Sequence, residues 1–468
     1  MHDCVGGMVF LACLMTLIGS GCSGRRGGDP VEQVPASAVI VEEINLAAML
    51  KEAGVSFPVC GDSLSAEAAE VLSLVAPSSL VQQMKYLMPC FDGLELSRVV
   101  CFTSAEGADI LVVPLADNDV LEKYLEEESG ELDETDGLLV AYHAGAVVAI
   151  SDNRFCWVGP DLMSVIEARS AASHGNFVEI KGVTDFLRSD DVFNLAVNCG
   201  NSSLSYLGGI NRWLCIGMKI TPQSVSLSGK VVSREGIPDS IGANFEVIDT
   251  DFLRYTPERA PVVLAFGKFS GNVRGLSMLL DRFAPIYLDE ADGTTALYAQ
   301  PVSGSVEAVR NQTSGSWNVA TMVHLPDTCL EAAIKRYKET APTTLTNLDE
   351  GDVQWTYAVE ENEYYFGDFH GNLVFSLNRE IAPEFSGNTY IDDFEGLRAA
   401  LIIDVPAGGV LAQAWNLPYG FTFKVKVDAV GWKTRITFNG TSMPAFRTLL
   451  DMPQLRDFNT KARSMAGM

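Results

Sequence analysis

Histidine, cysteine and carboxylate side chains carry most protein chemistry, and in this sequence they form no standard catalytic motif. No HExxH pair or other close metal-ligand spacing occurs among the five histidines, which are His2, His143, His174, His324 and His370. The sequence has no GxSxG motif for a nucleophilic serine. We therefore predict no catalytic residue, no metal ligand and no cofactor. The many acidic residues leave one alternative open, a hydrolase with carboxylates in a cleft between two domains.

Aromatic residues in one predicted hairpin suggest binding instead. The hairpin contains Trp355, Tyr357, Tyr364 and Tyr365, and the alternation in Trp355-Thr356-Tyr357 predicts two rings on one face. Exposed aromatic rings suit a protein or glycan ligand. The alternative is that this aromatic face belongs to the hydrophobic core.

The N-terminus carries the sharpest signal. An apolar run of eleven residues, Met8 to Ile18, is too short to cross a bilayer but has the length of a secretory signal core. The small residues that follow, Gly19-Ser20-Gly21, precede Cys22 and resemble the lipobox of bacterial lipoproteins. This resemblance implies a signal peptide over residues 1–21 and a lipid on Cys22. The alternative is a buried N-terminal helix with an incidental cysteine.

The resemblance to a lipobox also implies a cellular location. Ser23, in place of an aspartate, favours the outer membrane of the cell envelope, facing either the periplasm or the outside. The polar residues that follow include glycine, arginine and proline without periodicity, so we predict a flexible tether over residues 22–34. No later segment is long and apolar enough to span a membrane. We expect attachment to the membrane through the N-terminal lipid.

Length and charge narrow the class of protein further. A chain of 468 residues exceeds the size at which one core usually stays undivided, so we expect two or three domains. The 33 basic and 60 acidic side chains give a net charge of −27. Such a charge repels polyphosphates, which disfavours nucleic-acid binding.

The cysteines are the next clue. Two lie in the predicted signal peptide and Cys22 is the predicted lipid site, so seven remain: Cys60, Cys90, Cys101, Cys156, Cys199, Cys215 and Cys329. Most of them sit in apolar strand-like contexts, where a buried, inert thiol is expected. Cys60 and Cys90 flank one predicted two-helix insert, and they are the candidate disulfide in an oxidising compartment.

Hydrophobic periodicity predicts the elements that would position these residues. Residues 39–44 predict a strand, Asn45 a helix cap, and residues 46–53 a short helix closed by Gly54. Residues 120–125 have a helical pattern, and we expect the acidic run over 126–136 to form an exposed loop. Alternation predicts two long hairpins, which pair residues 213–220 with 225–233 and residues 421–427 with 432–438.

Runs of consecutive strands with few helices between them favour an α+β fold. We predict two related halves, each a mostly antiparallel sheet with helices packed on one face, over residues 35–249 and 250–468. The same order of strands, helices and a closing hairpin in both halves indicates an internal duplication. Two unrelated α+β domains are the alternative.

One phrase resembles a known family. VPASAVIVEEINLAAMLKEAG, together with the turn from Pro89 to Leu94, is similar to the Bacteroidales lipoproteins of unknown function called the DUF4836 type. The resemblance implies a location and a fold more than an activity. We therefore expect a cell-envelope lipoprotein with a non-catalytic binding or scaffolding role, and the carboxylate hydrolase remains the alternative.

Overall fold

The computed structural model describes most of the chain in two compact units. The described residues are 28–54, 87–130, 132–143, 146–189, 191–201, 212–238, 245–250, 260–268, 293–301, 306–311, 317–324, 345–350, 353–359, 363–369, 372–376 and 391–452. Unit 1 takes its residues from 1–239 and 442–468, and unit 2 takes its residues from 240–441.

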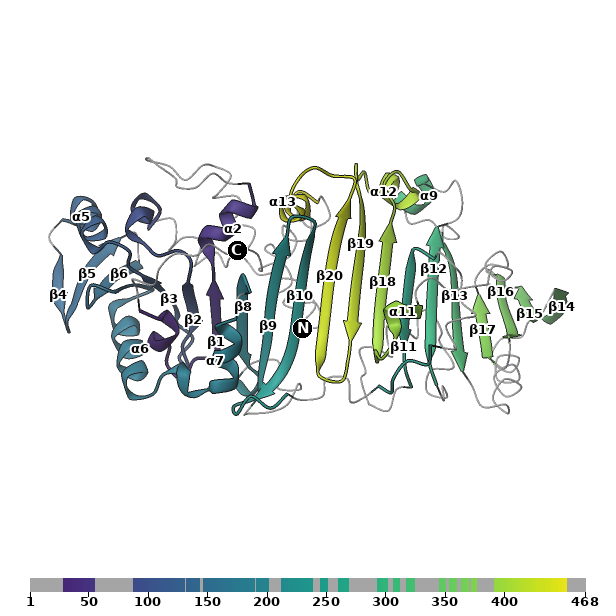
Figure 1. Ribbon diagram of the computed structural model, residues 1–468, viewed down its shortest axis with the longest axis horizontal. Helices are drawn as coiled ribbons and strands as arrows, with labels where there is room; N and C mark the ends of the chain where they lie inside the picture. Colours follow the sequence, from purple (N-terminus) through teal and green to yellow (C-terminus); the bar gives the residue numbers. More distant parts are fainter. Residues whose placement is uncertain are drawn as a thin grey trace. The chain divides into compact units, whose positions relative to one another are not determined.

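Unit 1 is built on an antiparallel sheet (Figure 1). Its described strands are β1 (Ile40–Ile44), β2 (Val99–Thr103), β3 (Asp109–Pro114), β4 (Asp133–Thr135), β5 (Leu138–His143), β6 (Ala146–Ser151), β7 (Phe155–Gly159), β8 (Phe193–Asn198), β9 (Arg212–Thr221) and β10 (Ser224–Ser233). They pair in the order β4-β5-β6-β7-β3-β2-β1-β8-β9-β10, and each of these pairs is antiparallel. The first of the two predicted hairpins is confirmed as β9 and β10.

Unit 2 is also built on an antiparallel sheet. Its described strands are β11 (Val262–Phe266), β12 (Thr295–Pro301), β13 (Trp317–His324), β14 (Leu345–Glu350), β15 (Val353–Val359), β16 (Glu363–Phe369), β17 (Asn372–Ser376), β18 (Ala399–Val405), β19 (Gly420–Val427) and β20 (Gly431–Asn439). Their order is β14-β15-β16-β17-β13-β12-β11-β18-β19-β20. The second predicted hairpin is confirmed as β19 and β20, and the antiparallel α+β class is confirmed.

Helical segments accompany both sheets. In unit 1 they are η1 (Pro30–Gln33), α2 (Leu46–Glu52), η2 (Met88–Gly93), α5 (Asn118–Ser129), α6 (Leu162–His174), η3 (Phe177–Glu179), α7 (Lys181–Leu187), η4 (Cys199–Asn201) and α13 (Ala445–Leu450). In unit 2 they are α9 (Val306–Arg310), α11 (Ile391–Phe394) and α12 (Val410–Ala414). The start of α2 follows the sequence prediction, because Asn45 Oδ1 accepts a hydrogen bond from Ala48 N at 3.1 Å.

The expectation of a loop over residues 126–136 is wrong. Helix α5 continues to Ser129, and Asp133–Thr135 forms the strand β4. Asp117 caps the start of α5, and Leu121 and Leu125 are buried on one side of the helix. Glutamate is a good helix former, so the acidic residues extend the helix while they stay in solvent.

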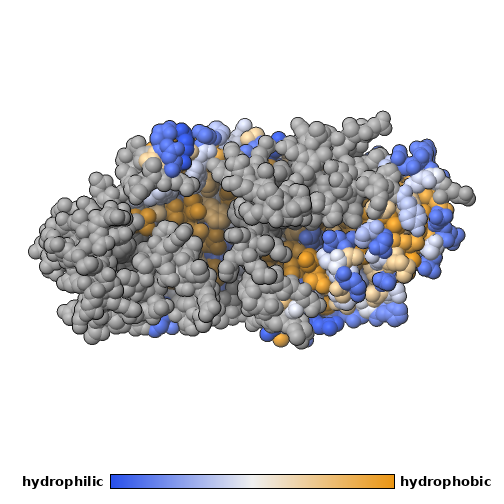
Figure 2. All heavy atoms as spheres, turned by 180° about the vertical axis from the view of Figure 1, so that it is seen from behind, coloured by the Kyte–Doolittle hydropathy of each residue, from blue (hydrophilic) through white to orange (hydrophobic). Residues whose placement is uncertain are grey.

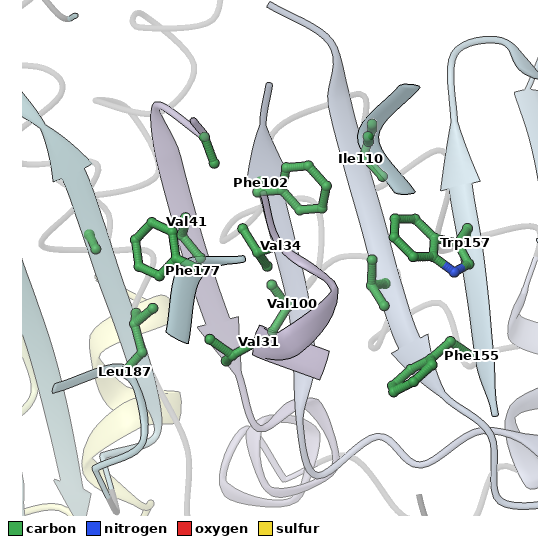
Figure 3. Packing of buried hydrophobic residues seen from close by; sticks show 14 of the residues in the cluster. Val31, Val34, Val41, Val100, Phe102, Ile110, Phe155, Trp157, Phe177 and Leu187 are labelled. Carbon is green, nitrogen blue, oxygen red and sulfur yellow. The ribbon is translucent and has the colours of Figure 1, made fainter. Parts of the chain in front are cut away.

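The core of unit 1 lies between the sheet and η1, η3, α6 and α7. Phe177 of η3 packs edge to face on Trp213 of β9, with ring centroids 5.0 Å apart. Trp157 is fully buried, and its indole Nε1 donates to Ser151 Oγ at 3.0 Å. Figure 3 shows Val31 and Val34 of the N-terminal segment among these core side chains.

The last part of the predicted tether, residues 28–34, is therefore folded. Val31 and Val34 are fully buried, and η1 occupies Pro30–Gln33. The reason is that two apolar side chains in a polar stretch gain more from burial than the short segment loses in conformational freedom. Composition alone marks the segment as a linker, whereas tertiary packing places it in the core.

Helical segments contact both faces of the unit 1 sheet. Phe155 and Trp157 of β7 belong to the core cluster, so the intervening Cys156 points to the opposite face. Burial raises the pKa of Cys156, and the proximity of Cys90 in η2 raises it further. The prediction of helices on one face only is thus too simple for unit 1. On the face turned away in Figure 1, Figure 2 shows both hydrophobic and hydrophilic residues among those that are coloured.

Candidate functional site

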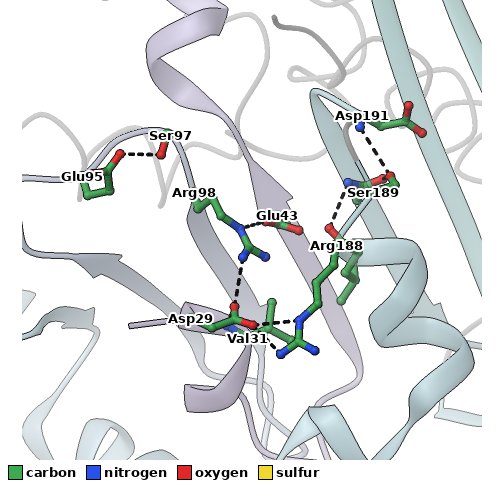
Figure 4. Close-up of polar contacts among 11 residues, drawn as sticks. Asp29, Val31, Glu43, Glu95, Ser97, Arg98, Arg188, Ser189 and Asp191 are labelled. Carbon is green, nitrogen blue, oxygen red and sulfur yellow. Dashed lines mark hydrogen bonds and ion pairs between the residues drawn. The ribbon is translucent and has the colours of Figure 1, made fainter. Parts of the chain in front are cut away.

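The best-defined polar arrangement in unit 1 is a group of charged residues beside the core. We call Asp29, Glu43, Arg98 and Arg188 the Asp29 cluster (Figure 4). Asp29 caps η1, Glu43 lies on β1, Arg98 immediately precedes β2, and Arg188 ends α7. Four segments that are distant in sequence therefore meet at one point.

Asp29 is the centre of the cluster. Its Oδ1 accepts from Val31 N at 3.2 Å and lies 3.3 Å from Arg98 Nη1. Its Oδ2 accepts from Arg188 Nε at 2.8 Å and also from Arg188 Nη2. Both carboxylate oxygens are therefore engaged by guanidinium groups, an arrangement that holds the start of η1 in place.

Glu43 is the buried member of the cluster. Its side chain pairs with Arg98 Nε, and the residue is 8% exposed. Burial raises the pKa of Glu43 to about 7, although the Arg98 guanidinium opposes the rise. Within the described part of the chain, Glu43 Oε2 and Arg98 Nη2 are buried without a hydrogen-bond partner. The Glu43–Arg98 pair therefore has one acceptor atom and one donor atom that are buried and unsatisfied.

A second polar group continues from the cluster along β8. Asn194 lies directly opposite Glu43 in the β1–β8 register. It donates from Nδ2 to Leu187 O at 3.1 Å, and its Oδ1 accepts from Ser189 Oγ at 3.1 Å. Lys219 Nζ lies 3.3 Å from Asp191 Oδ1. These contacts fix the connection between α7 and β8.

The contacts of Asp29 indicate a structural role for this residue. A general base needs a carboxylate oxygen that is free to receive a proton from a substrate. Both oxygens of Asp29 are already hydrogen-bonded within unit 1. The cluster instead ties the N-terminal segment to the sheet and to α7.

A different pair of acids lies on the opposite face of the sheet. Glu42 precedes Glu43 on β1, so its side chain points the other way, next to Cys101 of β2 in the register. Burial and, to a smaller extent, the neighbouring Asp109 carboxyl group together raise the pKa of Glu42 to about 7. Asp109 Oδ1 accepts from Thr103 Oγ1 at 2.7 Å. The hydrolase alternative places its carboxylates between two domains, whereas this pair lies within unit 1; a carboxyl group with such a pKa can still donate a proton near neutral pH.

The candidate disulfide is described at one end only. Cys60 lies outside the described residues, as does the predicted lipid site Cys22. Cys90 is buried in η2, where its Sγ donates to Leu87 O at 3.0 Å. Burial raises the pKa of Cys90 to about 12. The pairing of Cys60 with Cys90 stays a prediction.

The other described cysteines have buried thiols. Burial raises the pKa of each of them, and they are Cys101, Cys156, Cys199 and Cys215. Thiolates are the reactive form of cysteine, so these four groups are poor nucleophiles. This agrees with the prediction of buried, inert thiols.

The predicted aromatic surface falls on two paired strands of unit 2. Trp355 and Tyr357 lie on β15, and Tyr364 and Tyr365 lie on β16. The register places Tyr357 directly opposite Tyr365. The strands therefore bring all four residues into one hairpin, and their role in binding stays a prediction.

No group of three or more histidine, cysteine or acidic side chains is placed to hold a metal ion in the described ranges. None of the helices in those ranges is both long and apolar enough to cross a bilayer.

The Asp29 cluster was not predicted from the sequence, although two sequence signals pointed to it. Asp29-Pro30 has the form of a helix start, with an acidic cap followed by proline in the first helical position. Glu43 lies two residues after the buried Val41, so the two side chains share the inward face of β1. A charge at an inward strand position requires a buried partner. Neither signal identifies Arg98 or Arg188 as that partner.

Comparison with known proteins gives little further guidance. No protein-family model matches the chain, and no curated protein matches it. Two solved structures of TP0453 are similar at a low level. Crystal form IV has a TM-score of 0.27 and 12% identity, and the match covers 43% of this chain and 80% of that chain. Crystal form I has a TM-score of 0.27 and 8% identity, with 44% and 80% covered. A likeness at this level supports no conclusion about function.

Proposed function

We propose that this protein is a lipoprotein of the cell envelope, anchored to the outer membrane by a lipid on Cys22, and that its folded body binds or scaffolds other molecules. The proposal is carried by the attachment of Asp29 to Arg98 and Arg188, because it fixes the chain soon after Cys22. A lipid at Cys22 would then be joined to a rigid body through a short connection. The similarity to the DUF4836-type lipoproteins, stated above, agrees with this role.

The two units are proposed to be copies of one ancestral repeat. Adding ten to each strand number of unit 1 gives the strand order of unit 2, from β4-β5-β6-β7 through to β8-β9-β10. A shared order of ten strands is a specific topology, so chance similarity of two α+β domains explains it poorly. A repeated body suits a scaffold, since each copy offers a similar surface that loops can modify.

The ligand is proposed to be a protein or a glycan that contacts the aromatic hairpin of unit 2. Trp355 and Tyr357 follow each other at alternate positions of β15, and Tyr365 is the register partner of Tyr357. Aromatic side chains in adjacent strands provide a broad, rigid contact area for such ligands.

Two measurements test this proposal. Mass spectrometry of the protein from envelope fractions should find a mature chain that begins at a lipid-modified Cys22, and the Cys22→Ser variant should leave the membrane fraction. Crosslinked partners or bound glycans recovered with the parent protein should be lost with the Trp355→Ala/Tyr357→Ala variant. An unmodified Cys22 on an uncleaved chain would overturn the anchor, and an unchanged set of ligands would overturn the aromatic surface.

A carboxylate hydrolase is the second candidate, and the pair of Glu42 and Asp109 is the observation that favours it. A carboxyl group whose pKa is raised to about 7, with a second carboxyl group close by, is an arrangement used in acid–base catalysis. Hydrolysis of envelope glycans or peptides by the purified protein, abolished in Glu42→Gln, would support this candidate over the binder.

A further inference from the structure

A small pocket lies between helix α6 and the β4–β5 hairpin of unit 1 (Figure 1). Its volume is about 320 Å³. Ligand pockets range from about 300 to 1,000 Å³, so this pocket suits a ligand of about one ring. The residues that line it are Asp136, Leu138, Ile166, Arg169, Ser170 and Ser173. The last four share one face of α6, because they are spaced by three or four positions along the helix.

Arg169 fixes the walls of the pocket. Its Nη1 donates to Asp136 O at 2.9 Å, and its Nη2 lies 3.5 Å from Asp152 Oδ2 in the β6–β7 turn. Asp136 and Gly137 have φ values of 52° and 70°, as in a two-residue hairpin turn. The guanidinium group thus joins two hairpin turns to α6, and the pocket is already formed without a ligand.

The polar residues of the lining can both donate and accept hydrogen bonds. Ser173 Oγ donates to Ser170 O at 2.7 Å, so its lone pairs remain available as acceptors. Ser170 is exposed, and its hydroxyl group can donate or accept. Asp136 and Arg169 carry opposite charges, so the lining as a whole has no net charge.

Two apolar side chains line the inner side of the pocket. Leu138 is fully buried, and Ile166 packs against the core of unit 1. A matching ligand needs an apolar face toward these two side chains and polar groups toward the others. The ring of a sugar has both, with C–H groups on its faces and hydroxyl groups around its edge.

Other classes of ligand match the pocket less well. An anion would lie beside Asp136, and the net charge of −27 would also repel it. A cation would lie beside Arg169. An entirely apolar ligand would take water from the serine hydroxyl groups without replacing its hydrogen bonds, which costs free energy. A neutral ligand with several hydroxyl groups avoids each of these costs.

We propose that the pocket between α6 and the β4–β5 hairpin binds a neutral monosaccharide. The site lies within unit 1, whereas the aromatic hairpin proposed to bind a ligand lies in unit 2. It therefore goes beyond the proposed function and depends neither on that hairpin nor on a lipid at Cys22.

Titration calorimetry of the full chain tests the class of ligand. The probes are glucose, galactose, mannose and N-acetylglucosamine, and the uronic acid and the amino sugar of the same stereochemistry serve as charged analogues. At least one neutral sugar should bind, and its charged analogues should bind at least about tenfold more weakly. Binding of none of the four neutral sugars, or tighter binding of a charged analogue, would overturn the proposal.

Two leucine variants locate the bound sugar. Ser170→Leu fills the pocket, whereas Ala171→Leu places the same side chain on α6 outside the lining. Both positions are exposed, so both variants should fold, and circular dichroism checks this. Loss of the hydroxyl group and of the space should weaken sugar binding at least about tenfold in Ser170→Leu, and Ala171→Leu should bind like the parent protein.

The aromatic hairpin of unit 2 provides the last comparison. Trp355→Ala/Tyr357→Ala should keep the affinity for the monosaccharide, because these residues lie outside unit 1. Binding that survives Ser170→Leu, or that is lost with the variant of the hairpin, would place the sugar elsewhere and overturn the proposal.

Discussion

The ion pair between Asp29 and Arg98 joins the N-terminal segment of unit 1 to the start of β2, with Asp29 Oδ1 3.3 Å from Arg98 Nη1. Arg98 in turn pairs with Glu43 of β1, and Asp29 pairs with Arg188 at the end of α7. Arg98 thus links the N-terminal segment to the sheet, and Arg188 links that segment to the end of α7. Loosening the segment should therefore also disturb the sheet.

Replacing Asp29 should weaken this attachment. Asp29→Asn removes the charge that both arginines face, and loss of hydrogen bonds to charged groups typically costs about 1.5–3 kcal/mol. Because the cluster is partly exposed, we expect a loss of about 1–2 kcal/mol in the free energy of unfolding. Denaturant unfolding of the mature chain measures the loss, and hydrogen exchange should become faster over residues 30–34. Asp152→Asn is the control, since Asp152 is 71% exposed in its 3.5 Å pair with Arg169. Equal losses in the two variants would contradict a special role for Asp29.

Glu42 should make unit 1 less stable as the pH rises. Its pKa of about 7 in the folded protein exceeds the ordinary glutamate value of 4.5 because burial disfavours the charged form. The folded state therefore holds the proton more tightly, so this stabilising contribution is complete below about pH 4.5 and is lost as the pH rises to about 7. The shift corresponds to at most about 3 kcal/mol.

Removing the titrating group isolates this effect. Glu42→Gln should make the fall in unfolding free energy between pH 4.5 and pH 7 less steep, as measured by denaturant titration at each pH, and the remaining fall belongs to Glu43, whose pKa is also raised to about 7. The variant of an exposed acid, Glu134→Gln, is the matched control and should keep the pH profile of the parent protein. A Glu42→Gln profile that falls as steeply as that of the parent would contradict the assignment.

Helix α13 should be necessary for the stability of unit 1. It follows β20 of unit 2 in sequence, yet Ala445 N donates to Pro222 O in the β9–β10 turn at 2.9 Å. Phe446 is fully buried, so Phe446→Ala should cost about 3–5 kcal/mol. Met443, which is 41% exposed, gives the control Met443→Ala. A small effect of Phe446→Ala on unit 1 unfolding would mean that α13 is dispensable there.

Local signals explain which parts of the fold could be predicted from the sequence. The β9–β10 and β19–β20 hairpins have clear alternation, and the cap at Asn45 is a contact between residues three apart. The Asp29 cluster depends on pairing between segments that only the folded sheet brings together. Composition marks residues 28–34 as a linker, since it does not register that two valines in that segment can reach the core. The order of the strands is a non-local property for the same reason.

Two glycines of unit 1 should respond to alanine with opposite signs. At Gly217 of β9 a Cβ atom would lie 2.5 Å from Asp191 Oδ2, 3.1 Å from Phe186 Cζ and 3.2 Å from Asn194 Oδ1. Gly217→Ala must therefore displace the polar group that fixes the α7–β8 connection, and we expect a loss of about 1–3 kcal/mol. At Gly175 the nearest atom would be Glu179 Oε1, at an ordinary contact distance of 3.7 Å, and φ is −178°. Gly175→Ala should be neutral or stabilising by up to about 1 kcal/mol, because alanine restricts the unfolded chain. Denaturant unfolding of both variants provides the comparison, and a tolerated Gly217→Ala would show that Asp191 and Asn194 can move without cost to unit 1.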